Sequence, residues 1–261
     1  SAAVRSDGLD ALQAAIRKLE EGHPDEALTS VTSLLAVDSE WIAARQLLAE
    51  IHYRCGEWKQ AQQAIDWLIY HGVESPRLAK MAGGVALASH DLPLALANLD
   101  YAVHVSPDTP GAQTLWGLSL LRGRRLEAAE EALSDALAIT PADSRALDGL
   151  AAIQLLRSDF AGAADWALQA LEHDMGLYSA HYHLGVALCH LERPEAARQA
   201  LEVCLRLNPR RAAPCFWLIR LAKGPLKNEQ LATEYQGRAS QMIRERRSVR
   251  VRPEGDTSTR S

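Results

Sequence analysis

The sequence predicts an all-α fold, a solenoid of stacked antiparallel helix hairpins. Of its 261 residues 48% are hydrophobic, which is enough for a packed core and excludes a disordered chain. Only 5% are aromatic, and Ala and Leu dominate the rest of the apolar fraction. Ala and Leu favour helices, whereas β-rich chains favour β-branched and aromatic residues. The second observation is a sequence period of 34 residues, and the third is the placement of prolines at fixed points of that period.

The period appears as ladders of similar residues over six repeats. A first ladder is entirely alanine: Ala27, Ala61, Ala95, Ala129, Ala163 and Ala197. A second ladder, twelve residues upstream, is entirely small: Ala15, Ala49, Gly83, Gly117, Ala151 and Gly185. A third is entirely aliphatic: Leu35, Ile69, Val103, Leu137, Leu171 and Leu205. Such self-similarity at a fixed period is the signature of a repeat protein.

Each repeat is predicted to be a helix hairpin, which is clearest between Ala142 and Pro209. A first helix, A, carries Leu147, Leu150, Ala151 and Gln154 with helical spacing, and the turn 157–159 follows it. A second helix, B, carries Ala163, Ala167, Ala170 and Leu171. We expect helices A and B to approach closely at the small ladders, and the aliphatic ladder to face the next repeat. Prolines near the start of helix B (Pro93, Pro194) and at its end (Pro107, Pro141, Pro209) agree with this division.

The motifs Trp116-Gly117, Leu150-Ala151 and Leu184-Gly185, followed by the alanine ladder and by Pro141 and Pro209, resemble the tetratricopeptide repeat family. The resemblance covers residues 8–211 as six units and implies a right-handed superhelix. Residues 1–7 would then be an N-terminal lead or tag remnant. Residues 212–247 are expected to form capping helices, because a solenoid needs a polar terminal face. Residues 248–261 would be a polar, basic tail.

No motif for catalysis is found, so we predict that the chain is not an enzyme and carries no cofactor. It contains no Gly-rich phosphate loop, no GxSxG and no HExxH. His181, His183, Cys189 and His190 gather in the sixth repeat, but no carboxylate joins them at helical spacing, and we interpret them as packing residues rather than a metal site. The cysteines (Cys55, Cys189, Cys204, Cys215) lack zinc spacing and are expected to be buried free thiols.

The resemblance implies a concave groove lined by positions 2, 5, 9, 12 and 13 of each A helix, called the groove slots below. The units are counted from Gly8 in steps of 34 residues, so that Ser144 and Tyr178 begin the fifth and sixth units. With this count the slots suggest an apolar floor with basic residues near its middle and a Tyr/His end. The candidate partner-binding residues are Arg77, Lys80, Leu118, Leu121, Arg122, Arg145, Leu155, Tyr182, Val186 and His190. The predicted function is a protein–protein interaction scaffold that binds a peptide with apolar anchors and an acidic group.

Two family sub-types can be compared with the sequence. Repeats that bind chaperone tails grip a carboxylate with a Lys/Asn/Asn/Lys/Arg set, but here Gly84 and Leu115 stand where the two Asn belong, so that ligand is not expected. Residues 163–221 also resemble repeats appended to bacterial alkaline-phosphatase-superfamily phosphodiesterases. The alternative is therefore an accessory or regulatory domain excised from a larger enzyme.

The distribution of charge along the chain indicates whether nucleic acid or a membrane is a partner. The net charge of −5 is unevenly distributed, since the 222 residues before Lys223 carry 19 Lys/Arg and 28 Asp/Glu, whereas the remainder carries nine and five. An acidic body does not favour nucleic-acid binding. Six arginines near the end could contact anionic lipid, but we expect a solubility cap rather than membrane binding. A homo-oligomer through the C-terminal segment is possible. A cytoplasmic location is favoured, or a periplasmic one if a signal segment was removed.

Overall fold

The computed structural model describes the backbone of residues 2–250 and the side chains of residues 8–245. Within this part the chain forms 14 α-helices and no strand. It divides into two compact units, Ser1–Ile139 and Thr140–Ser261, which are described separately. The all-α helical repeat fold predicted from the 34-residue period is confirmed.

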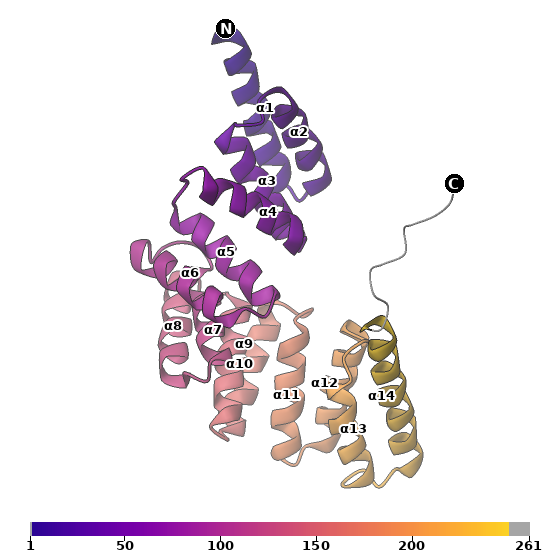
Figure 1. The fold of residues 1–261 in the computed structure, drawn as a ribbon. Coiled ribbons are helices and arrows are strands. Elements are labelled where there is room, and N and C mark those ends of the chain that lie inside the picture. The colour runs from indigo at the N-terminus through magenta and orange to yellow at the C-terminus, as the bar shows by residue number, and fades with distance from the viewer. Residues whose placement is uncertain (1, 251–261) are drawn as a thin grey trace, which may run out of the picture. The chain divides into compact units, whose positions relative to one another are not determined.

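The first unit consists of four helix hairpins, in which each odd-numbered helix packs against the following even-numbered one (Figure 1). The helices are α1 (Ala2–Glu20), α2 (Pro24–Val37), α3 (Ile42–Arg54), α4 (Trp58–Tyr70), α5 (Pro76–Ala88), α6 (Leu92–Val105), α7 (Ala112–Arg122) and α8 (Leu126–Ile139). Helix A of the first repeat thus begins at Ala2, ahead of the expected start at Gly8.

The second unit has three further hairpins built in the same way. Its helices are α9 (Ser144–Leu156), α10 (Phe160–His173), α11 (Tyr178–His190), α12 (Pro194–Leu207), α13 (Ala213–Lys223) and α14 (Glu229–Arg250). Tyr235, Ala239 and Met242 of α14 pack into the same core as Leu218 and Leu221 of α13. Helix α14 runs past the expected boundary at residue 247, and residues 251–261 of the expected tail lie outside the described part.

The small ladder lies where helices A and B touch, as predicted. A Cβ added to Gly117 or to Gly185 would lie 2.6 Å from the Cγ of Leu133 or Leu201, and one on Gly83 would lie 2.5 Å from the Cγ of Leu99. Each leucine follows its glycine by 16 residues. Where the ladder has alanine the residue at the same offset is shorter or β-branched: Val31, Ile65 and Ala167. The shapes of the side chains at the A–B contact are therefore complementary, as dense packing requires.

The A–B turns share one backbone feature. A residue with a left-handed conformation recurs every 34 residues, with φ between 57° and 85°, at Gly22, Gly56, His90, Arg124, Ser158 and Glu192. Ser158 lies in the turn predicted at residues 157–159. Only two of the six are glycine, although this conformation costs any other residue about 1–2 kcal/mol.

The aliphatic ladder does not behave uniformly. Val103, Leu171 and Leu205 are buried, but Ile69 is 54% exposed. Ile69 instead borders a small cavity with Val73, Leu78 and Tyr101 where α4 gives way to α5 and α6. Ile69 thus faces the next repeat, as predicted, but that repeat leaves about half of it exposed.

The four cysteines differ in burial, although all were expected to be buried. All four cysteines are free, and Cys204 and Cys215 are buried, but Cys189 is half-buried and Cys55 is exposed at the end of α3. Burial raises the pKa of Cys204 to about 12 and that of Cys189 to about 11. Neither thiol has the lowered pKa of a reactive cysteine.

Candidate functional site

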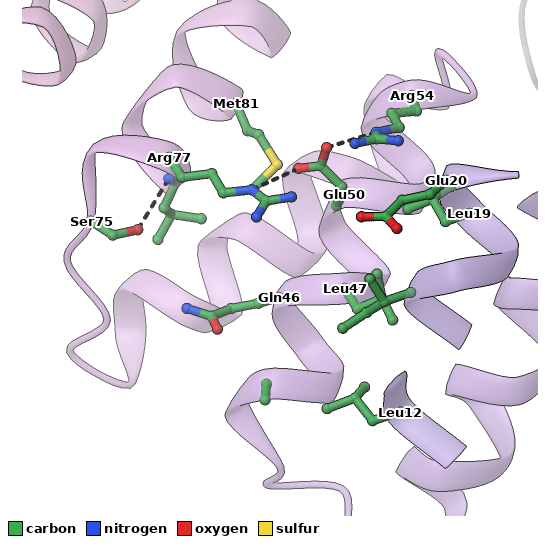
Figure 2. Close-up of a pocket in the computed structure, with 13 residues that line it drawn as sticks. Leu12, Leu19, Glu20, Gln46, Leu47, Glu50, Arg54, Ser75, Arg77 and Met81 are labelled. Carbon is green, nitrogen blue, oxygen red and sulfur yellow. Dashed lines mark hydrogen bonds and ion pairs between the residues drawn. The ribbon is translucent and has the colours of Figure 1, made fainter. Parts of the chain in front are cut away.

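Three successive A helices of the first unit, α1, α3 and α5, line a pocket of about 270 Å³ (Figure 2). We call it the A-helix pocket. Nine of its 13 lining residues occupy groove slots: Leu12, Ile16, Leu19, Glu20, Ala43, Gln46, Glu50, Arg54 and Arg77. The other four are Leu47, Ser75, Leu78 and Met81. The repeat register therefore places these nine groove slots of α1, α3 and α5 on one continuous surface.

The floor of the pocket is apolar. Leu12, Leu19 and Leu47 are buried members of the core that joins α1 to α3, and Leu78 and Met81 are buried in α5. Helix α5 begins beside the pocket because Pro76 favours its first turn and Ser75 caps it. The Oγ of Ser75 accepts a hydrogen bond from the N–H of Leu78 at 3.2 Å. Ile16 projects from α1 and remains 38% exposed.

A buried carboxylate lies at the polar end of the pocket. Glu50 is only 6% exposed, and each of its carboxylate oxygens accepts from a different guanidinium (Figure 2). Oε1 lies 2.8 Å from Nε of Arg54 in the same helix, and Oε2 lies 3.4 Å from Nε of Arg77 in α5. Glu50 thus joins two adjacent A helices.

The charges around Glu50 decide its ionisation. Burial alone raises the pKa of the Glu50 carboxyl, but the hydrogen bond from Arg54 and the charges of Arg77 and Lys80 outweigh it, so the pKa lies below the usual 4.5. The pKa of Lys80 is lowered because burial disfavours its charge, although the Glu50 carboxylate opposes this effect. Glu50 is therefore ionised at neutral pH.

The candidate residues of the first unit have different environments. Arg77 borders the pocket, and Lys80 is half-buried close enough to Glu50 to affect its pKa. Arg122 donates from Nη1 to the backbone oxygen of Leu87 at 3.1 Å, at the C-terminal end of α5. Leu118 and Leu121 are half-buried on α7. Arg77 and Lys80 are thus brought together, whereas Arg122 belongs to a contact between repeats.

Two candidates of the second unit, Tyr182 and His190, belong to an aromatic cluster. His190 is stacked on Phe160, with ring centroids 4.0 Å apart, and meets the edge of Trp217. Trp217 donates from Nε1 to the hydroxyl of Tyr182 at 3.2 Å. Val186 is buried, so little of it reaches the surface.

The remaining two candidates of this unit lie on α9. Arg145 is exposed at the start of the helix, and Leu155 is half-buried near its end. Their role in binding stays a prediction.

Two buried acidic residues in groove slots were not among the candidates, Glu50 and Asp148. Asp148 is 7% exposed, and its Oδ1 lies 2.6 Å from Nδ1 of His183. Both occupy slots that the repeat register identifies, at the ninth position of the second repeat and the fifth of the fifth repeat. The signal that could have found them is an acidic residue at a slot in the middle of an A helix, because such a group needs a partner when it is buried.

The other histidines of α11 have structural partners. Nε2 of His181 lies 3.0 Å from the backbone oxygen of Met175, and His183 pairs with Asp148. Among residues whose side chains are described, no three His, Cys, Asp or Glu groups gather to hold a metal ion.

The C-terminal arginines can be followed only in part. The side chains of Arg246, Arg247 and Arg250, and the whole of Arg252, lie outside the described residues. Between residues 2 and 250 no helix has both the length and the apolar character needed to cross a membrane.

Comparison with known proteins gives two kinds of result. Two profiles described as "Tetratricopeptide repeat" match residues 18–82 and, in overlapping copies, residues 80–144 and 114–178. Together they cover more than half of the chain. None of the curated proteins matches the sequence. No comparison bears on the resemblance to phosphodiesterase-associated repeats, which stays a prediction.

Solved structures with the same kind of fold share little sequence. A chain of the APC/C hetero-tetramer Cut9-Hcn1 has a TM-score of 0.72 at 16% identity, over 82% of this chain and 42% of its own length. A tetratricopeptide repeat protein from Parabacteroides merdae has a TM-score of 0.62 at 13% identity and 93% coverage of both chains. MamA gives 0.53 at 15% identity, over 64% of this chain and 96% of its own. The chain therefore spans less than half of the Cut9-Hcn1 chain, and these likenesses show the fold alone.

Proposed function

The chain belongs to the tetratricopeptide repeat family, and we propose that it is a non-catalytic scaffold that binds a segment of a partner protein in the A-helix pocket. Such repeats generally mediate protein–protein interactions, through the surface that successive repeats present together. The observation that carries the proposal is the pocket between α1, α3 and α5, with an apolar floor and charged groups at one end.

The composition of the pocket supports a peptide as the ligand. Burying one large aliphatic side chain contributes about 1.5–3 kcal/mol, so apolar anchors on the floor would supply affinity. Ile16, which is partly exposed, would be covered by such an anchor. The charged end would then fix the direction and register of the bound segment.

The same residues do not favour catalysis. The 13 lining residues include no His and no Cys, and the Oγ of Ser75, the one hydroxyl among them, already accepts a backbone hydrogen bond. Acyl or phosphoryl transfer would need a nucleophile paired with a base. A volume of about 270 Å³ also lies below the usual range for small-molecule sites, which begins at about 300 Å³.

The test is selection of binding peptides from a displayed library of random dodecapeptides, followed by affinity measurement on matched variants. Ile16→Asp places a charge on the pocket floor and should weaken the selected peptides at least tenfold. Leu94→Asp places the same charge on α6, outside the pocket, at a residue of similar exposure (46% against 38%), and should leave affinity unchanged. Equal affinity for both variants and the parent, with thermal unfolding showing both folded, would contradict the proposal.

A further inference from the structure

The buried carboxylate of Glu50 is not available to a ligand. Both of its oxygens are taken by Arg54 and Arg77, and it lies almost wholly beneath the surface. A positively charged group of a partner would therefore find this carboxylate already neutralised. What reaches the surface is the outer part of the two arginines, whose side chains are 46% and 66% exposed.

The contact with Glu50 uses only one nitrogen of Arg77. A guanidinium has five donors in a rigid plane, and the contact to Glu50 is made through Nε. The two Nη groups can still donate to a second anion, in the paired geometry that matches a carboxylate. Because Nε is held, the plane of the group is oriented before a ligand arrives, which lowers the entropy lost on binding.

The charge balance at this end of the pocket is positive. Arg54 and Arg77 contact the single carboxylate of Glu50, and the charge of Lys80 also lowers its pKa. The other acidic residue of the pocket, Glu20, comes from α1, and Figure 2 shows it on the opposite side of Glu50 from Arg77. The side formed by α5 is therefore the one suited to an anion.

We infer that the A-helix pocket recognises a partner segment carrying an Asp or Glu side chain beside an apolar anchor, with Arg77 binding the carboxylate and Glu50 acting as the positioning residue. This inference rests on the proposed function and specifies its ligand. The apolar anchor lies on the floor beside Met81 and Ile16, which border the same pocket as Arg77. Among segments with equivalent apolar residues, the pair Glu50–Arg77 thus favours those that also carry an Asp or Glu.

The test uses two displayed libraries of random dodecapeptides that differ only in a fixed central residue, Glu in one and Gln in the other. Peptides enriched from each are synthesised as Glu/Gln pairs, and their affinities for the parent chain, Arg77→Gln and Glu50→Gln are measured by fluorescence anisotropy. The parent should prefer the Glu member at least tenfold. Arg77→Gln should reduce the preference to about twofold or less, and Glu50→Gln, which releases the Arg77 guanidinium but keeps its charge, should reduce it in part. The affinity for the Gln member should change little in both variants.

Two controls separate a specific role from general damage. Arg77→Lys keeps the charge but loses the forked geometry, and should retain only part of the preference. Lys59→Gln removes a positive charge from an exposed site on α4, outside the pocket, and should leave the preference at its parent value.

The outcomes distinguish the two proposals. Binding that Ile16→Asp abolishes but that shows no preference for Glu, or a preference unchanged in Arg77→Gln, would overturn the present inference and leave the pocket as the binding site. Binding that is insensitive to Ile16→Asp would overturn the proposed function, and this inference with it.

Discussion

The two units each bury one carboxylate at a groove slot, and the partners of the two groups differ. Glu50 in the first unit is held by two arginines, and Asp148 in the second is paired with His183. The side chain of Arg77 is 66% exposed, whereas that of His183 is only 19% exposed. An arginine also has donors to spare after one contact, while an imidazole has only two ring nitrogens. Groove slots of different repeats therefore leave exposed donors in one unit and form an enclosed packing contact in the other.

The largest effect on stability is expected from breaking the more enclosed pair. Asp148→Ala leaves His183 without its acceptor in a poorly hydrated site, and should lower the free energy of unfolding by about 2–3 kcal/mol. Chemical denaturation of the variant and the parent measures this difference. Peptide affinity at the A-helix pocket should not change, and a loss of that affinity would show that Asp148 is not confined to packing.

Replacing a glycine at the A–B contact with alanine should lower the free energy of unfolding by a similar amount in both units. Gly117→Ala in the first and Gly185→Ala in the second each place a Cβ 2.6 Å from a leucine Cγ, and should cost about 1–3 kcal/mol through overpacking. Unfolding measurements on both variants test whether the two units share one framework.

The chain itself supplies the rescue variant for this prediction. Combining Gly117→Ala with Leu133→Ile recreates the residue pair found at Ala49 and Ile65, which are both buried. The double variant should be more stable than Gly117→Ala alone. If its loss of stability exceeds the sum of the losses in the two single variants, shape complementarity is not the explanation.

The pH dependence of the first unit should carry the signature of Glu50. Because its pKa is lowered in the folded chain, ionised Glu50 stabilises the fold above its unfolded-state pKa, and this contribution is lost as the pH falls through the lowered folded-state pKa. Glu50→Gln should be less stable than the parent at pH 7, and the difference should shrink in acid. Thermal unfolding from pH 7 downwards tests this, and a difference that does not change with pH would contradict the ion-pair account.

The smallest effect is expected in the A–B turns. Ser158→Gly, in the second unit, replaces a side chain that is strained at φ 64°, and should raise stability by up to about 1 kcal/mol. Gly56→Ala, at the equivalent turn of the first unit, should lower stability by a similar amount. Opposite signs in a denaturation series would confirm that both turns require the left-handed conformation.

The sequence period predicts some of these structural features and not others. The 34-residue period predicts the hairpins, the A–B contact and the register that places nine lining residues on one pocket, because each depends on contacts that repeat. The period could not predict that Ile69 is exposed, since this depends on how α4 and α5 meet at a single junction. It also gave no sign of the left-handed turns, because four of the six residues are not glycine.

Of the ten candidate partner-binding residues only Arg77 lines the A-helix pocket, whose other slot residues come from the first two repeats and were not among the candidates. Arg77 and Lys80 could be assigned to the groove from their slots. The carboxylate that Arg77 contacts comes from the neighbouring helix α3, so this pairing depends on how far α3 and α5 are separated in space. Arg122 illustrates the converse, because its slot suggests a ligand contact, whereas its guanidinium bonds to the backbone at Leu87.

The most direct test of the central claim is site-specific photocrosslinking of a labelled peptide selected from the Glu library. A benzoylphenylalanine is introduced in place of Ile16 in the A-helix pocket or in place of Leu94 on α6, two residues of comparable exposure. We predict crosslinking from position 16 that an excess of unlabelled peptide abolishes, and none above background from position 94. Crosslinking from position 94 with none from position 16 would show that partners bind elsewhere on the chain.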